Sequence, residues 1–145
     1  MSVALAPIRT ALDDLPMPPC AKLLGWHVVD ARPEEGWIRI GFMAKPEFTN
    51  PAGFIQGGFL AAMLDDTMGP AVFVMTEGAL YTVSIDMNVS FLSPARPGPL
   101  FSEGRVIQLG KSVGLIEATL SDGAGTVVAR ATSSAKLVPS AKALK

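Results

Sequence analysis

Histidine and cysteine are nearly absent from this sequence of 145 residues, and their scarcity excludes several kinds of site. A single cysteine, Cys20, cannot form an internal disulfide or a zinc site built from several cysteines. A single histidine, His27, leaves little material for a catalytic triad or a histidine-based metal site. We expect structural roles for both side chains, and a function that needs no metal or other cofactor.

Charge is also scarce. Charged residues make up 17% of the chain, whereas about 25% is usual in soluble domains. The net charge of −1 offers no electrostatic attraction for nucleic acid. No run reaches the ~18 apolar residues that a membrane span needs, and the first residues do not resemble a secretory signal. We expect a cytoplasmic protein with no nucleic-acid or membrane partner.

Apolar residues are abundant instead, at 49% of the chain. In a chain with so few charges, this surplus predicts self-association or an apolar ligand. The length predicts one domain. We place that domain at residues 26–138, after an N-terminal arm with a short helical turn (1–25) and before a flexible tail (139–145).

The order of the predicted elements favours an α+β fold. Alternating apolar residues predict strands at 26–32 and 36–43, and one long helix is expected at 57–75. Four more strand-like runs follow from residue 80, separated by turn-forming residues. This order predicts one antiparallel sheet of about five to six strands wrapped around one long central helix. Pro70 lies inside the helix, where we expect it to cause a kink or an end.

The predicted helix has no polar face, which makes its carboxylates unusual. Its glycines and alanines gather on one side, with Asp65 among them, and larger apolar residues that should pack on the sheet occupy the other. A charge among small residues is costly unless it is paired or used. A buried carboxylate held by backbone donors and a functional carboxylate therefore both remain open. Asp66 lies between the two sides, where we expect it to be solvated or hydrogen-bonded. The sheet-facing residues are Phe59, Leu60, Met63, Leu64, Ala71 and Val74.

The helix begins with two glycines, Gly57 and Gly58, whose N–H groups have no partner within the helix. Such groups can hold a carbonyl oxygen that gains negative charge, although a tight turn would use the same residues. Gly57 and Asp65 are about 12 Å apart along a helix axis. One substrate carbonyl cannot contact both in one chain. If both act on it, two chains must meet at a two-fold axis.

Three segments carry a resemblance to a known family. They are NPAGFIQGGFLAAMLDDTMG, VSIDMNVSFLSPARPG and GKSVGLIEATLSDGAGTVVARATSSAKLV. Together they resemble the hotdog-fold acyl-CoA thioesterases of the PaaI (phenylacetate degradation) type, in the 4-hydroxybenzoyl-CoA thioesterase-like superfamily. The resemblance runs from about residue 20 to residue 138. It implies a helix wrapped by an antiparallel sheet, homodimers whose sheets join edge to edge, pairing of dimers into tetramers, and active sites at the dimer interface.

The resemblance also implies roles for individual residues. Asp65 would be the general base or the nucleophile, and the Gly57 N–H would hold the oxyanion. Asn50 and Gln56 would surround the thioester, and Ser84 would orient the attacking water. From the residues alone, an inward structural hydroxyl is the favoured reading of Ser84. The coenzyme A part of the substrate would contact Gly58, Arg96, Gly110, Lys111 and Ser112.

Gln56 is a departure from the family pattern, which usually has histidine there. A glutamine amide can replace histidine as a hydrogen-bond donor but cannot shuttle protons. Hydrolysis of an acyl-CoA is therefore our leading expectation. The alternative is a non-catalytic protein that binds or senses acyl-CoA. A hotdog dehydratase or hydratase is disfavoured, because such sites usually pair an acid with a histidine and His27 lies outside the motif.

Overall fold

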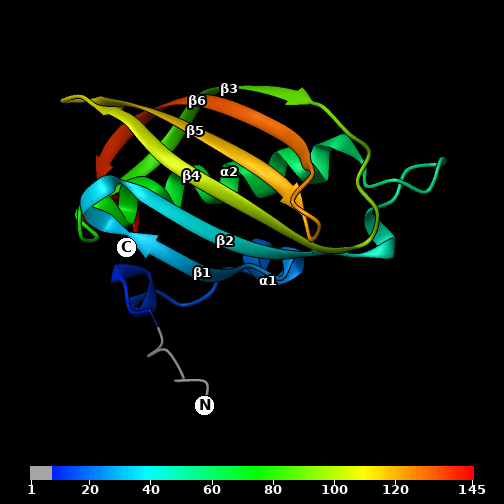
Figure 1. Cartoon of the computed structure of the whole chain (residues 1–145). Helices are drawn as coiled ribbons and strands as arrows, with labels where there is room; N and C mark the ends of the chain where they lie inside the picture. The colour runs from blue at the N-terminus through cyan, green and yellow to red at the C-terminus, as the bar shows by residue number, and fades with distance from the viewer. Residues whose placement is uncertain (1–7) are drawn as a thin grey trace, which may run out of the picture.

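A computed structural model describes residues 8–145 and shows one curved antiparallel sheet around one long helix, as predicted (Figure 1). The sheet has six strands in the order β1-β2-β4-β5-β6-β3, so β1 and β3 form its two edges. The strands are β1 (His27–Arg32), β2 (Trp37–Ala44), β3 (Leu80–Phe91), β4 (Gly98–Leu109), β5 (Val113–Asp122) and β6 (Val127–Pro139).

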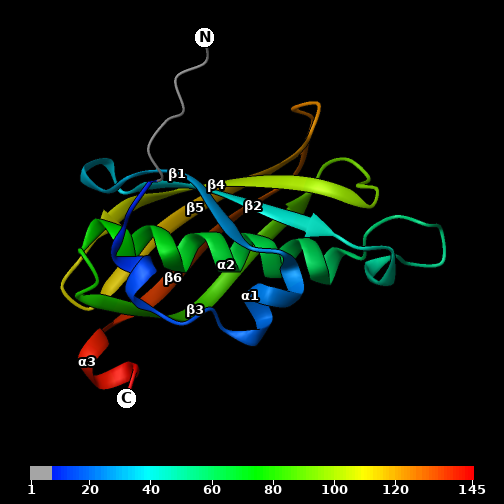
Figure 2. The same ribbon diagram turned by 90° about the horizontal axis from the view of Figure 1, so that it is seen from below.

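The long helix α2 (Gly57–Met75) lies along one face of the sheet, and the short helix α1 (Pro19–Leu24) lies beside it (Figure 2). By length and composition alone α2 is apolar enough to cross a membrane. Here it is the core helix, because its apolar side packs against the strands. The described residues also form short 3-10 helices: η1 (Ala11–Asp14) in the N-terminal arm, η2 (Pro33–Glu35) between β1 and β2, and η3 (Pro46–Phe48) between β2 and α2.

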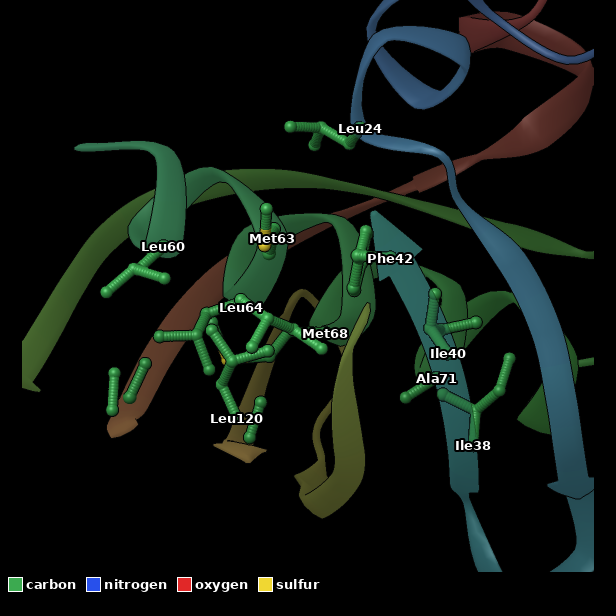
Figure 3. Packing of buried hydrophobic residues seen from close by; sticks show 14 of the residues in the cluster. Leu24, Ile38, Ile40, Phe42, Leu60, Met63, Leu64, Met68, Ala71 and Leu120 are labelled. Atoms are coloured by element: carbon green, nitrogen blue, oxygen red, sulfur yellow. The ribbon is translucent and has the colours of Figure 1, made fainter. Parts of the chain in front are cut away.

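The core forms where α2 meets the inward face of the strands (Figure 3). Alternation along β2 buries Ile38, Ile40 and Phe42 completely, as its sequence pattern predicts. Burying one such side chain contributes about 1.5–3 kcal/mol, so these layers supply most of the driving force for folding. The sheet-facing side of α2 is buried as predicted except for Phe59, which is half-buried and stacks on Phe48 at a ring distance of 4.2 Å.

The prediction for Pro70 was wrong about the end of the helix, since α2 continues to Met75. Proline has no N–H, so the carbonyl of Asp66, four residues earlier, loses its helical donor. The indole N–H of Trp26 donates to that oxygen instead, at 2.9 Å. The substitute donor explains how a buried helix accommodates a proline in its interior.

The two ends of the chain are more structured than the sequence suggests. In the N-terminal arm, Thr10 and Asp13 form a reciprocal capping box on η1. Where we expected a flexible tail, β6 extends to Pro139 and a short helix follows, α3 (Ser140–Ala143). The Ser140 N–H donates to the carbonyl of Ala79 at 2.9 Å, which ties this helix to the start of β3. The first seven residues of the expected arm lie outside the described part of the chain.

Candidate active site

Asp65 lies on the open side of α2, facing the edge strand β3. Its side chain is exposed, and its Oδ1 accepts a hydrogen bond of 3.0 Å from the Ser84 hydroxyl. Sequence reasoning from the residues alone favoured a structural role for Ser84, whereas the family resemblance implied that Ser84 orients the attacking water. The structure brings the two side chains together, with one carboxylate oxygen held by the Ser84 hydroxyl and no hydrogen bond to the other among residues 8–145.

A β-bulge in β3 directs Ser84 toward the helix. The pairing of β3 with β6 shifts register between Ser84 and Asp86. Before the bulge, the even-numbered Thr82 faces the helix, since its hydroxyl lies 3.0 Å from the Cβ position of Gly69. After the bulge, the odd-numbered Met87 packs against the core. A bulge changes which side chains share a face, because strand periodicity is two.

Asp66 differs from its neighbour and from our expectation. We expected a solvated or hydrogen-bonded side chain, but among residues 8–145 the buried Oδ2 has no hydrogen-bond partner. Burial, and secondly the negative charge of Asp65, raise the pKa of Asp66 to about 7. Protonation removes the desolvation cost of the charge, so Asp66 keeps its proton well above the pH at which an aspartate ordinarily releases it.

The start of α2 presents two glycines in different surroundings. A Cβ at Gly57 would lie 3.1 Å from the ring of Phe91, the last residue of β3, whereas a Cβ at Gly58 would meet open space. Gln56 precedes them as the N-cap, but its side chain makes no capping hydrogen bond. The N-terminal N–H groups of α2 therefore keep their capacity to bind an anion or a polarised carbonyl.

The loop before α2 is organised by Asn50. Its Oδ1 accepts hydrogen bonds from the N–H groups of Ala52 and Phe54, at 3.0 and 3.1 Å. Arg96, from the loop that follows β3, places its guanidinium 5.0 Å from the ring centre of Phe54. Asn50 and Arg96 thus lie at the same end of α2 as Gly57, with the Arg96 charge on an exposed rim.

The turn of Gly110, Lys111 and Ser112 lies at the opposite end of the sheet in the same chain (Figure 1). The Ser112 carbonyl accepts from Leu137, which pairs with Thr82 near the start of β3. Arg96 lies beyond the far end of that strand, and a strand of this length spans about 40 Å. One chain therefore does not bring together the two groups that the resemblance assigned to coenzyme A.

The edge formed by β3 exposes large apolar side chains. Val83 and Ile85 are 50% and 60% exposed, and Phe91 at the end of the strand is 55% exposed. An unpaired strand edge with such side chains is a surface on which another strand can add. It runs directly past Asp65, so anything that pairs with it borders the site.

No group of three or more histidine, cysteine, aspartate or glutamate side chains that could hold a metal ion occurs in the described part of the chain. Cys20 is exposed on α1. The His27 ring lies against Gly41, where a Cβ would collide with it. His27 is thus packed on the opposite edge of the sheet from Asp65.

Comparison with known proteins assigns the family. The family profile described as "Thioesterase superfamily" matches residues 52–129, which include most of the site and more than half of the chain. The chain belongs to the thioesterase superfamily. It is therefore a thioesterase, an enzyme that hydrolyses thioesters, and its fold is the hotdog fold.

Three relatives illustrate the match. Human acyl-coenzyme A thioesterase 13 is 30% identical over 105 residues, covering 71% of this chain and 73% of the relative. The crystal structure of a phenylacetic acid degradation-related protein from Ralstonia eutropha JMP134 superposes with a TM-score of 0.81 at 32% identity, covering 87% of this chain and 95% of the other. A Streptococcus mutans protein solved with acetyl CoA shares the fold, with a TM-score of 0.68 at 18% identity, covering 79% and 89%.

Sequence reasoning missed three contributors to the site. The burial of the Asp66 carboxyl was missed, because its position between the two sides of the helix does not reveal which residues cover it. The position of Phe91 over Gly57 depends on the bulge. The partnership of Trp26 with the helix joins residues 40 positions apart. Its only available signal was Pro70, which requires some outside donor for the Asp66 carbonyl.

Proposed function

We propose that this thioesterase hydrolyses an acyl-CoA to a free acid and coenzyme A. The observation that carries the proposal is the hydrogen bond from Ser84 to Asp65 on the open side of α2. Serine can orient both the carboxylate and a water beside it. The human relative named acyl-coenzyme A thioesterase 13 and the neighbour bound to acetyl CoA support this substrate class.

Asp65 serves the reaction in one of two ways. As a general base it accepts a proton from water, and the resulting hydroxide adds to the thioester carbon. The C–S bond then breaks, and the proton passes to the departing sulfur. As a nucleophile its carboxylate displaces the thiolate to form a mixed anhydride, which water hydrolyses. A thiol has a pKa near 8.5, so the leaving group needs little acid assistance in either route.

The oxyanion of the reaction needs a donor that Asp65's own chain does not supply nearby. Gly57 and Asp65 lie on one helix, about 12 Å apart along its axis. We therefore assign the oxyanion to the N–H of Gly57 of the partner subunit, at the positive end of its helix. Gln56 of the partner subunit adjoins that glycine, and its side chain, which makes no capping hydrogen bond, donates its amide N–H to the thioester carbonyl in the role that histidine usually fills.

Pairing of two β3 edges supplies this arrangement. Within one chain, Ser84 of β3 lies beside Asp65 of α2, and Phe91 at the end of β3 lies beside Gly57 at the start of α2. An antiparallel pair with its two-fold axis near Met87 sets each Phe91 opposite the partner's Ser84. The same symmetry brings Arg96 close to the partner's turn at residues 110–112, which joins the two basic groups proposed for coenzyme A. A homodimer is therefore the unit that carries complete sites.

Asp65→Asn tests the proposed chemistry. We expect wild-type protein to release thiol from a panel of aromatic, short and medium aliphatic acyl-CoA substrates, detected with a thiol-trapping dye. Because asparagine is neither a base nor a nucleophile here, the variant should lose at least about 100-fold in kcat on the best substrate.

The control is Glu34→Gln, which removes an exposed carboxylate from η2. It should keep wild-type rates. Equal rates for Asp65→Asn and wild type would contradict the mechanism. Calorimetric binding of acyl-CoA with no turnover by wild type would instead favour the non-catalytic alternative.

A further inference from the structure

The hydrogen-bond ladder of α2 is interrupted directly beside Asp65. Pro70 occupies the position whose N–H would donate to the carbonyl of Asp66 in an unbroken helix. An unsatisfied carbonyl within a packed helix is costly, and prolines commonly kink helices at this place. The turn that presents Asp65 is therefore the turn of α2 that most needs support from outside the helix.

Trp26 supplies that support from the segment between α1 and β1. Its indole N–H donates to the Asp66 carbonyl at 2.9 Å, and the ring packs against the core. Its backbone is itself fixed, because the Trp26 N–H donates to Ala21 at 3.0 Å after the left-handed C-cap at Gly25, with φ of 67°. The backbone that carries the indole donor is thus held in place by the end of α1.

The rest of this turn is already constrained by the sheet. Thr67 is fully buried, and its Cγ2 lies 3.0 Å from the Cβ position of Gly104 on β4. A Cβ added at Gly69 would lie equally close to the Thr82 hydroxyl, so the helix backbone approaches β3 closely there. These contacts hold the far side of the turn, whereas Trp26 holds the carbonyl that follows Asp65.

We propose that Trp26 is a positioning residue for Asp65, acting through the Asp66 carbonyl that Pro70 leaves without a helical donor. The inference rests on the proposed function in that Asp65 must be the reacting carboxylate. Without the indole N–H, the carbonyl turns toward another donor, the turn rotates, and Asp65 loses its alignment with Ser84. The effect should appear in kcat rather than in KM, because Trp26 does not contact the substrate.

Two substitutions test the pairing of Trp26 with Pro70. Trp26→Phe keeps most of the ring but removes the donor, and should lower kcat about fivefold to tenfold with KM within about twofold. Pro70→Ala restores a helical N–H to the Asp66 carbonyl, so the indole is no longer needed. In the Pro70→Ala background, Trp26→Phe should change kcat by less than about twofold.

Equal losses of kcat in both backgrounds, or no loss in either, would overturn the proposal. If Trp26→Phe does not fold, the Trp26 indole proton is measured by NMR in wild type and Pro70→Ala. In wild type the Trp26 indole proton should exchange with solvent more slowly than the Trp37 indole proton. In Pro70→Ala the Trp26 proton should exchange faster than it does in wild type. Unchanged exchange would overturn the proposal as well.

The outcome is separable from that of the proposed function. If Asp65→Asn retains wild-type turnover, the proposed chemistry fails, whatever the Trp26 variants do. If Asp65→Asn abolishes turnover while Trp26→Phe acts identically with proline or alanine at position 70, only the positioning role fails.

Discussion

The two edges of the sheet are built differently. β1 has six residues, a register shift after Val28, and charged side chains at Asp30 and Arg32. β3 has 12 residues and exposes Val83 and Ile85. Short, irregular and charged edges resist pairing with other strands, whereas long apolar edges invite it. The difference indicates that one edge is closed to assembly and that the edge beside Asp65 is open to it.

Substituting one valine on each edge tests most directly whether only the β3 edge supports assembly. Val83→Lys places a charge on the β3 edge, and we expect it to convert dimers into monomers. It should also lower kcat about 100-fold, because each site loses the partner's oxyanion donor. Light scattering and the acyl-CoA assay measure both effects.

Val29→Lys is the matched control on β1, where the valine is 37% exposed. It should leave both the assembly and the rate unchanged. Monomers that retain full activity after Val83→Lys would contradict the shared site. Loss of the dimer after Val29→Lys would show that the interface lies on β1 and not on β3.

A smaller effect is expected from Ser84→Ala within the β3 edge. The variant removes the hydroxyl that donates to Asp65 at 3.0 Å, and hydrogen bonds to charged groups contribute about 1.5–3 kcal/mol. We expect kcat to fall about 10-fold with the dimer intact. Ser90→Ala removes an exposed hydroxyl from the same strand and should have no effect. Similar losses for the two variants would show that the strand, rather than the Ser84 contact, matters.

The smallest effect concerns Asp66, whose carbonyl lies against Trp26 on the β1 side of α2. Its pKa is raised from 3.8 to about 7. Between these values the folded state holds a proton that the unfolded chain releases, so the free energy of unfolding falls as pH rises. Asp66→Asn removes this penalty. We expect a small gain in Tm at pH 5, where part of the penalty is already present, and a larger gain of a few degrees at pH 8, measured by thermal unfolding.

Glu34→Gln again serves as the control for Asp66→Asn, because it removes an exposed carboxylate. An equal change in Tm at both pH values for Asp66→Asn would show that the carboxyl is not held protonated. A loss of stability at pH 8 would show that its charge has a partner.

The elements that sequence reasoning predicted well are those governed by local periodicity. The alternation of Ile38, Ile40 and Phe42 predicted the buried face of β2, and the two glycines predicted the start of α2 at Gly57. Contacts between distant segments were not predictable in this way. Proline propensity suggested a break at Pro70. The helix continues because Trp26, 44 positions earlier, supplies a donor to the same turn, and no local sequence pattern reveals that contact.

The bulge in β3 has a consequence for how the enzyme can change. The odd-numbered residues from Val83 to Phe91 are all apolar, so a regular strand would turn them all inward and Ser84 outward. The extra residue keeps Met87 and Val89 in the core but sends Val83 and Ile85 to the surface. The bulge thus places the Ser84 hydroxyl beside Asp65 and also exposes the apolar side chains of the β3 edge. A chain that lost the bulge would lose both the contact proposed for catalysis and the edge proposed for the dimer.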